Sequence, residues 1–320
     1  MHLDLSGNNS WEHVDGGIDA VADGAVAIAV AIAPALEQLT SLQHLDLSDI
    51  AFGAAGAVAL APAIEKLTSL QHLDLNGAGF ETAGAVALAP AIDKLTSLQH
   101  LDLSDNAFGA AGAVALAPAI EKLTSLQHLG LRGNAFGAAG SVALGPALGK
   151  LTSLQCLDLR GSSIQVHPQT WDTISVAAQK RLRRRNNKFG AAHAGALVPL
   201  LGKLASLQRL DLSRNNFGAV AIGVLAPALG KLTSLQRLDL GYNRFEAAGA
   251  VALAPALAKL TSLESLDLNQ CQFVFADAPA LVTALGKLER LKSFRRPPAH
   301  PDEWKTERGL RRAMGPGYLP

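Results

Sequence analysis

The chain of 320 residues lacks the features that mark several common protein classes. Its two cysteines are too few for a disulfide framework, and aromatic residues make up only 5% of it. Charged residues account for 17%, below the usual quarter, and the formal net charge of +1 argues against a disordered chain of one charge sign. No apolar run is long enough to cross a bilayer, and the first residues lack the regions of a secretory signal. The sequence therefore predicts a cytoplasmic protein, with a nuclear location left open, and no membrane partner.

What the chain has instead is internal repetition. A block that begins Leu-Thr-Ser-Leu at residue 39 returns every 28 residues as far as residue 151. Its pattern resumes at residue 204 and again recurs every 28 residues, as far as residue 288. The gap between the two runs is three residues short of two periods, so it is expected to contain one damaged copy, at about 176–203. A period of this length indicates a stack of similar structural units.

Each copy combines two hydrophobic periods. In the copy at 95–122, Leu98, Leu101 and Leu103 follow the two-residue alternation of a short strand, whereas Leu116 and Ile120 lie on one face of a helix. A single unit of this kind cannot bury both apolar faces, but stacked copies can. We therefore expect a strand and a helix in every repeat.

These copies resemble leucine-rich repeats of the ribonuclease-inhibitor-like class, including the GALA type with its Gly-Ala-x-Ala-Leu-Ala helix start. The resemblance implies an α/β solenoid shaped as a horseshoe, with parallel strands on its concave face and helices on its convex face. Residues 39–294 would form the repeat array, with an irregular segment at 162–185 that is either a functional loop or a decayed repeat. Residues 1–38 would be an irregular first repeat, either truncated or folded back as a cap, and 295–320 a basic, flexible tail.

Three other columns of the repeat have structural explanations. A recurring Phe, such as Phe108, predicts an aromatic spine in the core, and a recurring Asn, such as Asn106, predicts a side chain that satisfies backbone groups of adjacent coils. A Pro late in each helix, such as Pro118, predicts short or bent helices because it removes a helical hydrogen bond.

The strand side chains that point away from the core form the candidate binding surface. We expect a ladder of His beside a ladder of Asp in the first half of the array, and an Arg stripe threaded with Asp in the second. The residues predicted to bind a partner are His44, Asp46, His72, Asp74, His100, Asp102, His128, Arg132, Asp158, Arg160, Arg181, Arg183, Arg209, Asp211, Arg237, Asp239 and Tyr242. Neighbouring carboxylates are expected to favour protonation of these histidines and to make binding pH-sensitive.

Rows of His and Asp also match the ligands of transition metals. Because successive repeats carry the same row, none stands out as a site, and we predict no metal and no cofactor. Enzyme signatures are missing from the sequence: Gly-Lys pairs such as Gly149-Lys150 close helices, whereas a phosphate loop opens one. The sequence thus predicts no catalytic residues and no enzyme.

The leading functional prediction is a scaffold that binds a protein partner on the concave repeat surface, as repeats of the resembled class do in ribonuclease inhibitors and NACHT-type immune receptors. One alternative is a GTPase-activating protein resembling the Ran GTPase activators, which share this repeat class. Another is a binder of phosphate-rich or nucleic-acid partners through the Arg stripe, although nucleic acid is the less favoured partner.

The near-zero net charge hides a strong asymmetry along the chain. Residues 1–122 carry a net charge of −12 and residues 123–320 a net charge of +13. This distribution predicts either a partner with both charge signs or head-to-tail self-association that weakens with salt.

Overall fold

The computed structural model describes residues 1–7, 18–161, 191–273 and 278–295. The chain divides into two compact units, each of which is described by itself. The first unit contains Met1–Leu154, and the second contains Gln155–Arg160 and the chain from Lys188 onward.

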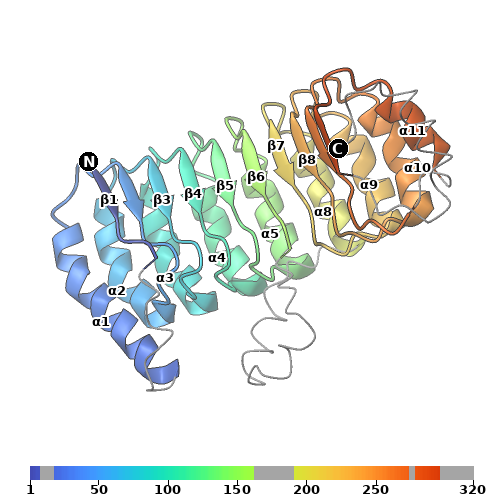
Figure 1. Cartoon of the computed structure of the whole chain (residues 1–320). Helices are drawn as coiled ribbons and strands as arrows, with labels where there is room; N and C mark the ends of the chain where they lie inside the picture. Colours follow the sequence, from blue (N-terminus) through green and yellow to red (C-terminus); the bar gives the residue numbers. More distant parts are fainter. Residues whose placement is uncertain (8–17, 162–190, 274–277, 296–320) are drawn as a thin grey trace. The chain divides into compact units, whose positions relative to one another are not determined.

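In the first unit, short parallel strands alternate with helices, and the helices all lie on one side of the sheet (Figure 1). Each strand pairs with the next one in identical register, so that His44 lies opposite His72, and Leu45 opposite Leu73. The strands are β1 (His2–Asp4), β2 (His44–Asp46), β3 (His72–Asp74), β4 (His100–Asp102) and β5 (His128–Gly130). The helices are α1 (Ile18–Leu36), α2 (Gly53–Lys66), α3 (Glu81–Lys94), α4 (Gly109–Ile120) and α5 (Gly137–Leu148).

The second unit repeats the same plan. Arg209 of one strand pairs with Arg237 of the next, and Asp211 with Asp239. Its strands are β6 (Cys156–Asp158), β7 (Arg209–Asp211), β8 (Arg237–Asp239), β9 (Ser265–Asp267) and β10 (Ser293–Arg295). Its helices are α8 (Ala191–Leu201), α9 (Ala219–Leu229), α10 (Glu246–Leu257) and α11 (Pro279–Leu285). Parallel strands that alternate with helices within each unit confirm the predicted α/β class.

The core lies between the strands and the helices, and the leucine pattern accounts for it. Leu101 and Leu103 of the strand segment and Leu116 and Ile120 of α4 are all fully buried. The Phe column is buried as predicted, with the rings of Phe52 and Phe80 stacked 6.4 Å apart. The other buried members of this column are Phe108, Phe136, Phe217, Phe245 and Phe273.

The Asn column satisfies the backbone of adjacent coils, as predicted. The side-chain nitrogen of Asn134 donates to the carbonyl of Leu103, one repeat earlier, at 2.8 Å and to that of Leu131 at 3.2 Å. Its side-chain oxygen accepts the backbone N–H of Asn106 at 3.1 Å. Asn106, Asn134, Asn215 and Asn243 are completely buried. This column therefore joins consecutive repeats through buried hydrogen bonds.

A helical glycine column has a reason that the sequence did not reveal. In α3, a β-carbon at Gly84 would lie 2.6 Å from the β-carbon of Phe80 and 3.0 Å from that of Ala57 on the preceding helix. The side chain of Phe80 and the preceding helix thus occupy the space that a side chain at position 84 would need. Gly56, Gly112, Gly140 and Gly249 are in the same position relative to their own Phe.

The prolines lie inside the helices without ending them. Pro62 of α2 and Pro90 of α3 are exposed on helices of 14 residues, and Pro118 of α4 is exposed on a helix of 12. These helices have ordinary lengths, so the prediction that the prolines shorten them is not confirmed.

Several predictions fall on residues outside the described parts of the chain. These are the irregular segment at 162–185, the basic tail beyond residue 295, and the candidate binding residues Arg181 and Arg183.

Candidate functional site

The strands of the first unit present the predicted histidine ladder. The imidazole rings of His44 and His72 stack 3.8 Å apart, those of His72 and His100 3.9 Å apart, and those of His100 and His128 4.2 Å apart. His2 continues the ladder with its ring tilted against His44 at 3.9 Å. The ring spacing follows from the strand register. Equivalent residues on neighbouring parallel strands lie about 4.8 Å apart, and the imidazole rings, which all project from the same face of the sheet, tilt toward one another.

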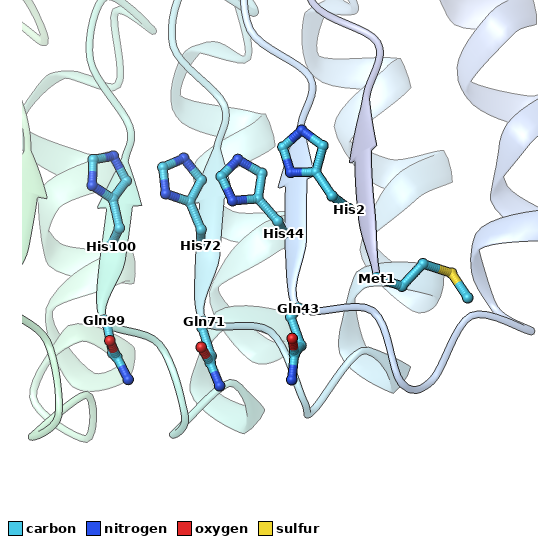
Figure 2. Close-up of a pocket in the computed structure, with 8 residues that line it drawn as sticks. All are labelled: Met1, His2, Gln43, His44, Gln71, His72, Gln99 and His100. Atoms are coloured by element: carbon cyan, nitrogen blue, oxygen red, sulfur yellow. The ribbon is translucent and has the colours of Figure 1, made fainter.

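A hollow of about 530 Å³ lies along this ladder. Figure 2 shows the imidazoles of His2, His44, His72 and His100 side by side, with a second row of glutamines below them. The glutamines that line the hollow are Gln43, Gln71 and Gln99, and Met1 lies at one end. The wall offers hydrogen-bond donors and acceptors from both rows, which suits hydrogen bonding to a polar segment.

Neighbouring carboxylates favour protonation of His44 and His72, as expected, but burial outweighs their effect on the pKa. Burial, together with the neighbouring histidines, lowers the pKa of His72 to about 4 and that of His100 to about 3. Burial and His2 also lower the pKa of His44, and these effects exceed the opposing effects of Asp46 and Asp4. At neutral pH these imidazoles are therefore uncharged. Because the rings stack in register, each imidazole packs against its neighbours and loses contact with water. A sequence pattern does not show this loss of solvation.

The aspartate ladder serves the backbone as well as the surface. Asp46, Asp74 and Asp102 each accept, through one carboxylate oxygen, the N–H of the residue two positions later at 2.8–2.9 Å. Burial, together with the neighbouring Asp102 and Asp46, raises the pKa of Asp74 to about 6. Asp158, Asp211, Asp239 and Asp267 of the second unit make the same bond. The ladder thus holds the chain as it leaves each strand, a role that the sequence analysis missed.

One group in this ladder brings potential metal ligands together. One ligand atom from each of His72, Asp74 and His100 lies within 4.8 Å of the other two, and all three side chains are half-buried. Among the described residues no other group of three such side chains meets that limit. The structure therefore distinguishes one row, which was not expected from repeats of the same sequence.

The second unit presents the predicted arginines with aspartates between them. Arg209 and Arg237 are exposed, whereas the carboxylates of Asp211 and Asp239 are half-buried. Burial raises the pKa of Asp239 to about 7, helped by the nearby Asp211. Nη2 of Arg160 lies 2.8 Å from Oδ2 of Asp158, and Nε of Arg160 lies 3.6 Å from Oδ2 of Asp211.

Two further candidates on the strand side interact with the residues around them. The guanidinium of Arg214 lies 4.0 Å above the ring of Tyr242, a cation–π contact in the second unit. In the first unit, Arg132 forms an ion pair with Asp105 and donates from its Nε to the same carboxylate at 2.7 Å.

The opposite side of each unit is apolar where the helices face solvent. Val58, Val86, Val114 and Val142 occupy the same position on α2 to α5 and are between 55% and 62% exposed. None of the helices in the described ranges combines the length and the hydropathy needed to span a membrane.

Comparison with protein families identifies the repeats. A leucine-rich-repeat family model matches residues 38–61, 66–89, 94–117 and 231–254, and a second leucine-rich-repeat model matches residues 206–232. No curated protein matches the chain. The chain thus contains leucine-rich repeats, and its fold is an α/β leucine-rich-repeat solenoid. The ribonuclease-inhibitor-like and GALA subtypes stay predictions.

Proposed function

We propose that the protein is an interaction scaffold whose strand side binds a protein partner. Leucine-rich repeats generally mediate protein–protein interaction. The observation that supports this role here is the ladder of half-exposed His side chains on β2 to β4, which the leucine core does not need, beside Asp side chains that also serve the backbone. Regular strands hold such side chains in fixed positions, so binding costs little conformational entropy.

The proposed surface comprises the predicted strand-side residues in each unit. In the first unit these are His44, Asp46, His72, Asp74, His100, Asp102, His128 and Arg132. In the second unit they are Asp158, Arg160, Arg209, Asp211, Arg237, Asp239 and Tyr242, and Arg181 and Arg183 stay predictions. Neutral histidines beside aspartates favour a basic, hydrogen-bonding partner segment on the first unit, whereas the exposed arginines favour acidic groups on the second.

Site-specific photo-cross-linking tests this proposal. A photoreactive amino acid is placed at Gln71, which is exposed on the strand side, or at Val86, which is 55% exposed on the helix side of the same repeat. Both variants are then exposed to the same cell extract. We expect one protein to be cross-linked from position 71 and not from position 86. A partner captured only from position 86 would show that recognition uses the helices instead.

Other features of the proposed function follow from the charge asymmetry and from the resemblance. Head-to-tail self-association is tested by light scattering at low and moderate salt, and a monomer at every ionic strength would refute it. GTPase activation, phosphate binding through the arginines, the cytoplasmic location and the lack of catalysis stay predictions.

A further inference from the structure

The histidine ladder contains a set of side chains that is arranged for coordination chemistry. β3 contributes His72 and Asp74, two residues apart and hence on the same side of the sheet, and β4 contributes His100 directly opposite His72. The stacked rings of the two histidines hold their nitrogens side by side, as Figure 2 shows. All of these residues belong to the first unit, so the arrangement does not depend on how the two units are placed.

The distances are within reach of a metal ion. The ligand atoms of His72, Asp74 and His100 all lie within 4.8 Å of one another. A tetrahedral zinc ion, with ligands at about 2.0–2.1 Å, separates its donor atoms by roughly 3.4 Å. We expect side-chain rotations to close the remaining difference.

The chemistry of the set selects the type of ion. Two imidazoles and one carboxylate suit zinc and related divalent transition metals, whereas magnesium and calcium prefer oxygen ligands alone. The Asp74 carboxylate is already oriented by the N–H of Asn76, which donates to its Oδ1 at 2.9 Å. A fixed ligand of this kind reduces the entropy lost on binding. The three side chains are half-buried and therefore still accessible to an ion from solvent.

We propose that His72, Asp74 and His100 bind one divalent transition-metal ion of the zinc type. The three residues also belong to the proposed partner-binding surface, but the metal site needs no group from outside this chain and can be tested without a partner.

The repeats themselves provide matched controls. His128 is the next member of the ladder, its ring 4.2 Å from His100, but it lies on β5, where Gly130 takes the place of an aspartate. Asp102 is the equivalent of Asp74 on the neighbouring strand and makes the same backbone hydrogen bond. Neither belongs to the group of three. Substitutions at these two positions therefore perturb the ladder equally without removing a proposed ligand.

The experiment is a calorimetric titration of the untagged, chelator-treated full chain with Zn²⁺ at neutral pH, with native mass spectrometry to count bound ions. We expect one ion per chain in the parent. His100→Gln and Asp74→Asn should each weaken binding roughly tenfold or more, whereas His128→Gln and Asp102→Asn should leave it unchanged. Circular dichroism confirms that each variant folds, and Asp74→Asn retains an oxygen for the Asn76 N–H.

A second readout separates coordination from surface adsorption. Co²⁺ bound through two imidazoles in a tetrahedral site develops intense visible absorption, which should appear in the parent and in His128→Gln but not in His100→Gln. The proposal is overturned if the parent binds no Zn²⁺, if it binds several ions equally, or if the control variants lose as much affinity as the ligand variants.

Discussion

The buried Asn column offers the sharpest test of how the repeats are held together. Asn134→Ala removes the amide that donates to the carbonyls of Leu103 and Leu131, and leaves the N–H of Asn106 without its side-chain acceptor. Each buried polar group left unsatisfied costs about 1–3 kcal/mol. The total is less than the sum of three such costs, because the backbone carbonyls keep part of their hydrogen bonding in the sheet. We therefore expect a loss of about 3 kcal/mol in the free energy of unfolding.

The assay is urea denaturation followed by far-ultraviolet circular dichroism, with Gln127→Ala as the control because Gln127 is exposed on the strand side. The control should stay within about 0.5 kcal/mol of the parent. Ile50 and Ala78 occupy the same column in earlier repeats and are buried without an amide. If Asn134→Ala is no less stable than the control, the column acts only by filling space, and the reasoning from hydrogen bonds is refuted.

Two further substitutions test particular contacts. Gly84→Ala should lower the free energy of unfolding by about 1–3 kcal/mol, because the new β-carbon would lie 2.6 Å from the β-carbon of Phe80. Alanine in an ordinary helix would instead raise the urea midpoint, and such a rise would contradict this prediction. Asp239→Asn should stabilise the protein by about 2 kcal/mol at pH 8 and hardly at all at pH 4. The folded-state pKa of Asp239 is raised from 3.8 to about 7, so the parent loses stability as pH rises through that window. Thermal melts at the two pH values measure this difference, and an equal shift at both would refute it.

The fold could be predicted because each copy repeats the same burial pattern. Leucines at the strand and helix positions, together with the Phe spine, mark every surface that must meet a neighbouring repeat. The departures from the pattern are also visible in the structure. At the position of the helical glycine, one repeat has Ala221, and there α9 begins at Ala219 after an extended Gly218, whereas α4 begins directly after Phe108. The helix of this repeat is thus one residue shorter than α4, 11 residues against 12.

The candidate site was predicted only in part. Alternation placed His72 and His100 on the strand side correctly, but the charge state of the ladder depends on how closely the rings pack across strands. The sequence shows that aspartates lie near the histidines. It does not show that burial affects the histidine pKa more strongly than the charge of those aspartates does. Identical rows likewise gave no reason to single out Asp74, which depends on small differences in side-chain position.

The central claim is that the strand side, and not the apolar helix side, recognises the partner. The most direct measurement is the affinity of the cross-linked partner, once purified, for two double variants of the same charge. Gln71→Glu with Gln99→Glu changes the strand side, and Val86→Glu with Val114→Glu changes the helix side. We expect the strand-side variant to bind at least tenfold more weakly and the helix-side variant to bind as the parent does. The reverse order would contradict the account.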